Sequence, residues 1–334
     1  MKKILALLCV TVLFLIPFSG CKKDNNSELT TVRLNEVTHS VFYAPLYLAI
    51  TLDYFKEEGI DLVLTNGAGA DKVMTAVLSG SDDIGFCGPE AAIYVYNEGN
   101  NNYPKVFAQL TKRDGSFLFS RNEEPNFQWS DLTNKEILAG RRGGVPAMTL
   151  EYVLNQHQLY NGTNVTLNYD VSFANMAPAF EGGVADYTTL FQPTASTMVT
   201  AEKGYIVASV GEESGEVPYT AFFAKTSYLY NNEDTVKSFL KAIYRAIKYM
   251  KENSLEIVAE KLSSQFQAST YTEILNSITS YSNIDAWMTN MAMTETSFNR
   301  LQDIMENAEE LDTRASYVNL IDNKYANDVY DLVF

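Results

Sequence analysis

Short apolar runs alternate with segments of helical periodicity along the first two thirds of the chain. Residues 33–37 alternate like a strand, an aromatic loop follows, and apolar side chains then recur at helical spacing as far as Gly59, a common helix-ending residue. The same order of strand, loop and helix returns over 62–78 and 83–97. Strands that alternate with helices are typical of a parallel sheet covered by helices. The pattern therefore predicts an α/β fold.

The rest of the chain predicts further strands and then helices alone. Strands are predicted at 105–110, 117–121, 136–139, 165–169, 186–190, 206–210 and 219–224, and helices between them at 147–158 and 175–181. The clearest helix is predicted over 233–251, where apolar residues share one face. More helices are predicted at 254–266, 271–281, 294–309 and 313–330.

The length of the chain indicates more than one core. About 300 residues follow the N-terminal segment, which exceeds one comfortable hydrophobic core, so we expect two lobes. A polar, glycine-containing loop at 111–116 interrupts the strand character on either side of it. We interpret this loop as a crossing from the first lobe to the second.

The first thirty residues indicate export. Lysines at positions 2 and 3 precede an apolar run from residue 4 to residue 18, which is too short for a membrane-spanning helix. Ser19 and Gly20 directly precede Cys21, as in the cleavage sites of bacterial lipoproteins. We predict a signal peptide over 1–20, lipid on Cys21 and a polar tether over 21–30. A plain secretory peptide with an unrelated cysteine is the alternative.

The charge of the chain argues against a nucleic-acid partner. There are 41 Asp and Glu against 25 Lys and Arg, giving a formal net charge of −16, and removal of the two leader lysines makes it −18. Phosphate binding needs clustered basic residues, and the closest clusters are the pairs Lys112–Arg113 and Arg141–Arg142. We therefore expect no nucleic acid among the partners.

Cysteine and histidine are too few for a metal centre of the usual kind. Cys9 would leave with the signal peptide and Cys21 would carry lipid, so Cys87 is the one thiol of the folded part. His39 and His157 are far apart in sequence and follow no zinc-binding pattern. We expect neither a disulfide nor a metal, and no cofactor.

The first unit also resembles a known family. It contains Ala44-Pro45-x-Tyr47-x-Ala49 after the aromatic loop and then Tyr54-Phe55-x-x-Glu58-Gly59-Ile60. Later segments extend the likeness: Ser79-Gly80 with Asp83-Ile84-Gly85, Lys135-Glu136-Ile137, and residues 298–308. With these motifs the mature chain resembles extracytoplasmic substrate-binding proteins of ABC importers over nearly all its length. The nearest branch handles thiamine pyrimidine precursors, sulfonates and taurine.

The resemblance implies a fold and a set of partners. The fold would be a two-lobed type II periplasmic-binding-protein (Venus flytrap) fold with two hinge crossings and a helical C-terminal part on lobe one. Lobe one would comprise 31–112 and 222–334, and lobe two 113–221. A small molecule would bind in the interlobe cleft and favour closure, and an ABC permease with its ATPase would recognise the closed form. The protein would be extracytoplasmic, held on the bacterial membrane through Cys21.

The aromatic loop favours a planar heterocycle, such as a thiamine, pyrimidine or riboflavin precursor, over taurine or alkanesulfonates. A sulfonate or taurine importer component and a sensory binding protein are the alternatives. An enzyme is a third, since a eukaryotic pyrimidine-precursor synthase shares this fold and uses a histidine and a cysteine-rich motif. With one mature thiol and an export signal, this chain is not expected to be an enzyme.

Loops after predicted strands supply the candidate ligand residues, because such loops line the ligand crevice of a parallel sheet. Phe42, Tyr43 and Phe191 could stack on a planar ring. His39 could bind ligand or brace its own loop. Backbone N–H groups at helix starts could bind a polar ligand group, or merely form tight turns, at Gly67, Gly69, Gly88, Gly143 and Gly144.

Polar side chains complete the predicted site. Glu90 could accept an amine or ring N–H of the ligand, or simply complement a helix dipole. Lys112 could meet an anion or remain solvated. Cys87 beside Glu90 is expected to be a small buried residue rather than a nucleophile. The remaining members of the predicted site are Asn175, Gln192 and Tyr219.

Overall fold

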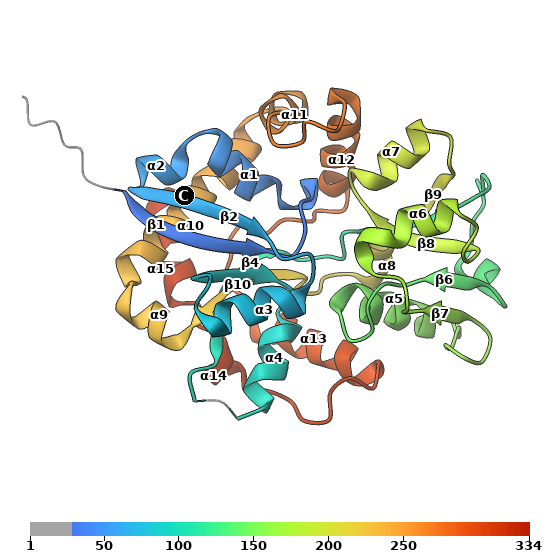
Figure 1. Ribbon diagram of the computed structural model, residues 1–334, viewed down its shortest axis with the longest axis horizontal. Coiled ribbons are helices and arrows are strands. Elements are labelled where there is room, and N and C mark those ends of the chain that lie inside the picture. The colour runs from blue at the N-terminus through green and yellow to red at the C-terminus, as the bar shows by residue number, and fades with distance from the viewer. Residues whose placement is uncertain (1–28, 100) are drawn as a thin grey trace, which may run out of the picture.

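The computed structural model describes residues 29–99 and 101–334, which form two α/β lobes side by side (Figure 1). The predicted signal peptide and Cys21 lie outside the described residues. The predicted tether ended at residue 30, but Thr30 already belongs to the first strand.

The first lobe is built on a sheet with the strand order β2-β1-β3-β10-β4. Strand β1 pairs in parallel with β2 and β3, whereas β10 runs antiparallel to both β3 and β4. The parallel sheet that the alternation predicted is therefore mixed, because β10 enters from the second lobe. The strands are β1 (Thr30–Glu36), β2 (Ile60–Asn66), β3 (Ile84–Cys87), β4 (Pro104–Thr111) and β10 (Thr220–Lys225).

The second lobe contains the other sheet, in the order β7-β6-β8-β5-β9. Strand β6 pairs in parallel with β7 and β8, and β5 is antiparallel to β8 and β9. The strands are β5 (Ser116–Ser120), β6 (Glu136–Leu138), β7 (Thr166–Asn168), β8 (Tyr187–Phe191) and β9 (Tyr205–Ser209).

The chain passes between the two sheets twice. It leaves the first sheet at the end of β4 and enters the second at β5, and it returns from α8 (Val210–Ser214) to β10. The predicted lobe boundary at 221–222 falls inside β10, whose Thr220 and Ala221 already pair with β4.

Helices cover both sheets. In the second lobe they are α5 (Val145–Gln156), α6 (Met176–Glu181), α7 (Thr194–Thr200) and α8. The N-terminal part of the first lobe contributes α1 (Ala44–Thr51), α2 (Tyr54–Glu57), α3 (Ala70–Ser79) and α4 (Glu90–Asn97). After β10 follow α9 (Thr226–Asn231), α10 (Glu233–Glu252), α11 (Leu255–Leu262), α12 (Tyr271–Asn283), α13 (Glu295–Asn307), α14 (Tyr317–Leu320) and α15 (Lys324–Val333).

The amphipathic helix α10 anchors the core of the first lobe. Phe239 on its buried face contacts Phe55 and Phe222, with ring centroids 5.3 Å apart in both pairs. Burial of one such ring stabilises the fold by about 1.5 to 3 kcal/mol relative to an exposed one. The helix thereby ties the C-terminal part of the chain to the sheet formed by its N-terminal part.

Two predicted helices are interrupted. The helix predicted after the aromatic loop is divided into α1 and α2 by Asp53, whose backbone is left-handed with φ 55°. Gly59, with φ 78°, follows α2 and ends the segment. The predicted helix over 313–330 is divided into α14 and α15 by Ile321, which is extended.

Candidate functional site

Polar contacts hold the two lobes together at the ends of their strands. Ser40 donates from its Oγ to the carbonyl of Gln192, at 2.6 Å. The hydroxyl of Tyr281 on α12 accepts from the backbone N–H of Gln192 at 2.9 Å and donates to the carbonyl of Gly115 at 3.1 Å. Tyr94 on α4 donates to the carbonyl of Gly143 at 2.9 Å. The lobes are thus closed on one another.

Aromatic side chains from both lobes and from the return crossing meet at this interface. Phe42, in the short helix η1 (Val41–Tyr43), is fully buried and contacts Phe191 of β8 edge to face, with centroids 5.8 Å apart. It also contacts Tyr219, at 5.7 Å, and Tyr281, at 4.8 Å. Tyr43 packs edge to face on Phe86 at 4.5 Å. The interface is therefore lined by rings whose faces and edges both suit a planar partner.

Gly115 explains how the first crossing can pass so close to these rings. A Cβ at this position would lie 2.8 Å from Phe191 and 2.9 Å from Phe42. No larger residue fits without moving one of the rings. The glycine thus lets Phe42 and Phe191 pack against the crossing between the lobes.

Glu90 begins α4 at the same interface and is 1% exposed. Its carboxylate folds back over Gly88, where a Cβ would overlap it. Burial raises the pKa of Glu90 to about 7, while the charge of Arg141 and nearby backbone N–H groups, including that of Val145, act to lower it. Both Arg141 and Val145 belong to the second lobe, so Glu90 faces across the interface.

A second buried carboxylate, Asp114, lies in the first crossing and is fully buried. Its Oδ1 accepts from the backbone N–H and the hydroxyl of Ser116, both at 2.6 Å. Burial raises the pKa of Asp114 to about 7, against the lowering effect of Ser116 and of the nearby Tyr219 hydroxyl. That hydroxyl is close enough to act on the pKa of Asp114, but it makes no hydrogen bond with the carboxylate.

Several buried polar atoms of this interface have no hydrogen-bond partner among the described residues. They are Glu90 Oε2, Asp114 Oδ2, Gln192 Nε2 and the Tyr219 hydroxyl. Because an unpaired buried polar group costs about 1 to 3 kcal/mol, such atoms are rare unless they serve a purpose. Their gathering where the two lobes meet makes this interface the candidate binding site.

His39 braces its loop. Its Nδ1 lies 3.1 Å from Glu36 Oε1 and its Nε2 lies 2.9 Å from the carbonyl of Gln265. The hydrogen bond to Glu36 raises the pKa of His39, against the lowering effect of partial burial. Tyr47 donates to the other oxygen of Glu36 at 2.5 Å. Both ring nitrogens of His39 are thus engaged by the protein itself.

Other predicted residues also have partners within the protein. Lys112 pairs with Asp285 at 2.6 Å and with Glu216 at 3.4 Å. The exposed Asn175 donates to Ser172 at 2.9 Å. Two of the loop glycines use their backbone N–H groups within the protein. Gly67 donates to the backbone carbonyl of Glu36, and Gly144 donates to the backbone carbonyl of Arg141. Gly69 begins α3.

The structure therefore brings together part of the predicted set. Phe42, Tyr43, Glu90, Phe191, Gln192 and Tyr219 meet at the interface, with Gly88 and Gly143 in contact with it. Cys87 lies beside them, fully buried, and burial raises its thiol pKa well above the ordinary value. A thiol in this state is not a nucleophile. Asp114 and Tyr281 were missed, because no local motif marks either residue.

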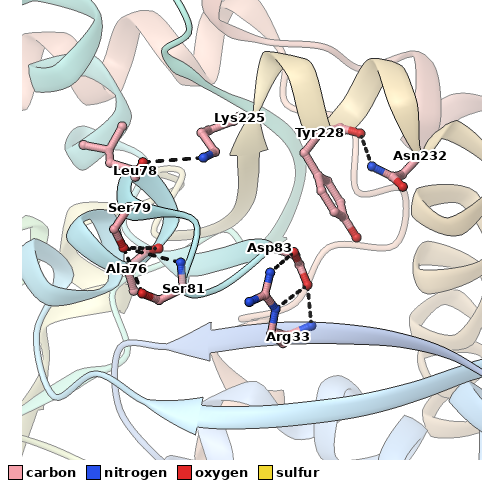
Figure 2. A network of polar contacts seen from close by, with 9 residues as sticks. All are labelled: Arg33, Ala76, Leu78, Ser79, Ser81, Asp83, Lys225, Tyr228 and Asn232. Atoms are coloured by element: carbon pink, nitrogen blue, oxygen red, sulfur yellow. Dashed lines mark hydrogen bonds and ion pairs between the residues drawn. The ribbon is translucent and has the colours of Figure 1, made fainter.

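A separate hollow of about 290 Å³ lies at the far end of the first lobe, away from the crossings. Arg33 meets Asp83 there through its Nε at 3.0 Å and its Nη2 at 2.6 Å, and Lys225 reaches the carbonyl of Leu78 (Figure 2). Asp82, which also lines the hollow, accepts from Asn35 at 2.8 Å. These charged groups tie strands and helices together, so the interlobe interface remains the candidate site.

Two further features concern only the part of the chain that the structure describes. None of its helices is long and apolar enough to span a membrane. Within the same residues, no group of three or more His, Cys, Asp and Glu side chains is arranged to hold a metal ion.

Solved structures share the fold. A protein from Bordetella bronchiseptica RB50 matches with a TM-score of 0.73 at 18% identity, over 91% of this chain and 98% of the other. The alkanesulfonate-binding protein SsuA from Xanthomonas axonopodis pv. citri, bound to MOPS, gives a TM-score of 0.71 at 15% identity, over 88% and 99%. The nitrate-binding protein NrtA from Synechocystis PCC 6803 gives 0.60 at 17%, over 75% and 70%. The two-lobed periplasmic-binding-protein fold predicted from the sequence is thus confirmed.

Sequence comparison gives the family. A protein from Bacillus subtilis (strain 168) that is named as a binding protein, YtlA, is 40% identical over 96% of this chain and 96% of its own length. The model of the family described as NMT1/THI5 like matches residues 41–257, which span both lobes. The chain therefore belongs to the NMT1/THI5-like family.

Proposed function

We propose that this protein is the ligand-binding component of an ABC import system and that it captures a small planar heterocycle between its lobes. The family, the two-lobed fold and the relative named as a binding protein support a binding role. The ligand would be of the thiamine, pyrimidine or riboflavin precursor type. The protein would act without a cofactor and would not be an enzyme.

The observation that carries the proposal is the meeting of aromatic rings from opposite lobes. Phe42 of the first lobe and Phe191 of the second are 5.8 Å apart, with Tyr219 of the return crossing beside both. Separation of the lobes would part these rings, and a planar ligand could then enter and be enclosed on closure. Each stacking contact adds about 0.5 to 1.5 kcal/mol beyond burial.

The polar residues around the rings would orient the ligand. Glu90 Oε2, Gln192 Nε2 and the Tyr219 hydroxyl have no partner among the described residues and are therefore free to bond a ligand. Micromolar affinity requires about 8 kcal/mol in total. Two or three stacks and several buried hydrogen bonds can supply this after ordering costs.

The closed form would be the one that a membrane permease, working with its ATPase, recognises. Closure brings contacts from both lobes onto the ligand at once, so the ligand shifts the population toward the closed form. The protein would work outside the cytoplasm, anchored through lipid on Cys21.

Native mass spectrometry of the protein purified without denaturation tests the proposal. A copurified planar heterocycle would support it. A copurified aliphatic sulfonate would contradict the heterocycle and leave the binding role standing. Loss of the corresponding uptake on deletion of the gene would support import, and unchanged uptake would contradict it.

A further inference from the structure

His39 lies between two oxygen atoms, one facing each nitrogen of its ring. Its Nδ1 is 3.1 Å from Oε1 of Glu36, and its Nε2 is 2.9 Å from the backbone carbonyl oxygen of Gln265. A carbonyl oxygen can only accept, so Nε2 carries a proton when this bond is made. The contact between Nδ1 and the carboxylate of Glu36 needs a second proton. A neutral imidazole has a single N–H, so it would leave a lone pair facing one of the two oxygens.

The surroundings of Glu36 place the second proton on the ring of His39. Glu36 is 1% exposed, and its Oε2 accepts from the hydroxyl of Tyr47 at 2.5 Å. A buried carboxylate needs a partner of opposite charge, and His39 is its one ion-pair partner in the described part of the chain. The rings of Tyr47 and Phe266 lie beside the imidazole, with centroids 4.6 and 4.7 Å away, close enough to attract a cation. The geometry thus favours an imidazolium at position 39.

The same contacts govern the titration of His39. The hydrogen bond to Glu36 raises its pKa above the ordinary value, and the bond to Gln265 and the charge of Glu36 also raise it, whereas partial burial lowers it. Glu36 on β1 and Tyr47 on α1 are the titratable groups that face the ring, and the segment 263–270 on its other side contains no titratable residue. Because the pKa is raised, both contacts are complete at low pH, and one of them is lost as pH rises through that pKa.

His39 joins two segments of the first lobe that hold the same residue of the second lobe. Ser40, the next residue, donates to the backbone carbonyl of Gln192 at 2.6 Å. The hydroxyl of Tyr281 on α12 accepts from the backbone N–H of Gln192 at 2.9 Å. Gln265 belongs to the segment that leads into α12. The contacts of His39 therefore fix the loop of Ser40 relative to the segment before α12, and both sides of the grip on Gln192 depend on that arrangement.

We propose that His39, as an imidazolium, positions residues 39–43 against the segment before α12, and that loss of its second ring proton loosens the grip on Gln192, so that closure of the lobes weakens as pH rises. His39 is a positioning residue, because it acts through Ser40 and Tyr281. The proposal rests on the proposed binding function, to which it adds a dependence on the pH around the protein. The side chain of His39 is 38% exposed, so the proton can pass directly to water.

The whole chain contains two histidines, which makes a direct test possible. Long-range proton–nitrogen correlation spectra of the full chain, purified without a histidine tag, report the protonation of each ring nitrogen, and His39→Gln assigns the two sets of signals. We expect the titration midpoint of His39 to lie above 6.5, the ordinary value, and to fall in Glu36→Gln. A midpoint at or below 6.5 in the parent would overturn the proposal.

Closure is measured on the same protein by small-angle scattering between about pH 5.5 and about pH 8.5, the range in which a histidine titrates. Burial raises the pKa of Glu90 and of Asp114 to about 7 at the same interface, so the parent alone does not isolate His39. The measured quantity is therefore the difference between variants. Across this range we expect the ratio of closed to open molecules to fall about fivefold further in the parent than in His39→Gln.

His39→Lys and His157→Gln provide the matched comparisons. Lysine stays charged across this range and keeps donors for Glu36, so His39→Lys should be more closed than the parent at the highest pH. A purely structural role of the ring would not give this gain. His157 contacts Glu213 at 2.8 Å within the second lobe, and His157→Gln should keep the pH profile of the parent. Circular dichroism at each pH confirms that every variant is folded.

The outcomes bear on this proposal alone, because none of these measurements uses a ligand. Equal pH profiles for the parent and His39→Gln would assign the dependence to other groups and overturn the proposal. The binding function would still stand, since its own test is the identity of a copurified molecule. A steeper profile in the parent that His39→Gln removes and His157→Gln keeps would support the role of His39.

Discussion

The hydroxyl of Tyr281 is a single group that joins the two lobes, and its removal should favour the open form. Tyr281→Phe keeps the aromatic ring and removes the hydroxyl that accepts from the backbone N–H of Gln192 at 2.9 Å. In the open form water can bind this N–H, so the substitution leaves it without a partner in the closed form alone. A buried donor left unpaired costs about 1 to 3 kcal/mol. The ratio of closed to open molecules should therefore fall by about 5- to 150-fold.

A second tyrosine provides the matched control. The hydroxyl of Tyr244 accepts from the N–H of Met291 at 2.9 Å and can donate to the carbonyl of Ala326 at 3.0 Å or to Asn290 Oδ1 at 3.2 Å. All of these partners lie within the first lobe. Tyr244→Phe should lower the melting temperature without changing closure. The comparison separates a contact between lobes from a contact within one.

Paired labels at introduced cysteines can measure closure in a protein that comprises the chain from Lys22 onward. Tyr160 in the second lobe is 49% exposed and Tyr230 in the first is 84% exposed, whereas Cys87 is fully buried and should not react. Distance distributions are then compared between the parent, Tyr281→Phe and Tyr244→Phe. If Tyr281→Phe leaves the closed fraction equal to that of the other two, the hydroxyl does not hold the lobes together.

Three further predictions concern the site and the anchor. Burial raises the pKa of Glu90 from 4.5 to about 7, so ionisation destabilises the folded state as pH rises across this window, and Glu90→Gln should gain up to about 3 kcal/mol over the parent above pH 7. Urea unfolding at several pH values measures the gain, and a gain independent of pH would contradict the cause. Tyr43→Ala and Phe191→Ala should each weaken binding of a planar ligand several-fold. Binding titrations that are unchanged for both variants would contradict the assignment of these rings to the binding site. Cys21→Ser should release the protein from membranes, and a variant that stays in the membrane fraction would refute the lipid anchor.

Much of the fold was predictable because its signals are local. The alternation of strands and helices needs only neighbouring residues, and the amphipathic face of α10 is visible in sequence. The break at Asp53 was not predictable, because helical spacing continues across it and only the left-handed backbone at that residue reveals it. The antiparallel direction of β10 depends on where the second lobe returns the chain, which no local pattern records.

The site shows the same division between local and distant causes. Phe42, Tyr43 and Phe191 could be proposed because loops after strands gather at one edge of a sheet. From the sequence, Asp114 is only part of a predicted crossing and Tyr281 is only part of a predicted helix. The role of Tyr281 comes from its hydrogen bond with Gly115, which is 166 positions away in the sequence. Glycine loops could not be resolved from sequence, since the same N–H group can bind a ligand or, as at Gly67, a neighbouring carbonyl.

The place of β10 in the first sheet has a consequence for the order in which the chain can acquire its structure. β10 lies between β3 and β4, yet it is synthesised after the whole of the second lobe. The second lobe is continuous in sequence and can form as soon as residue 214 is available, whereas β3 keeps an unpaired edge until residue 225 arrives. The inserted lobe can thus be finished first, and the lobe that begins the chain is the last to be completed.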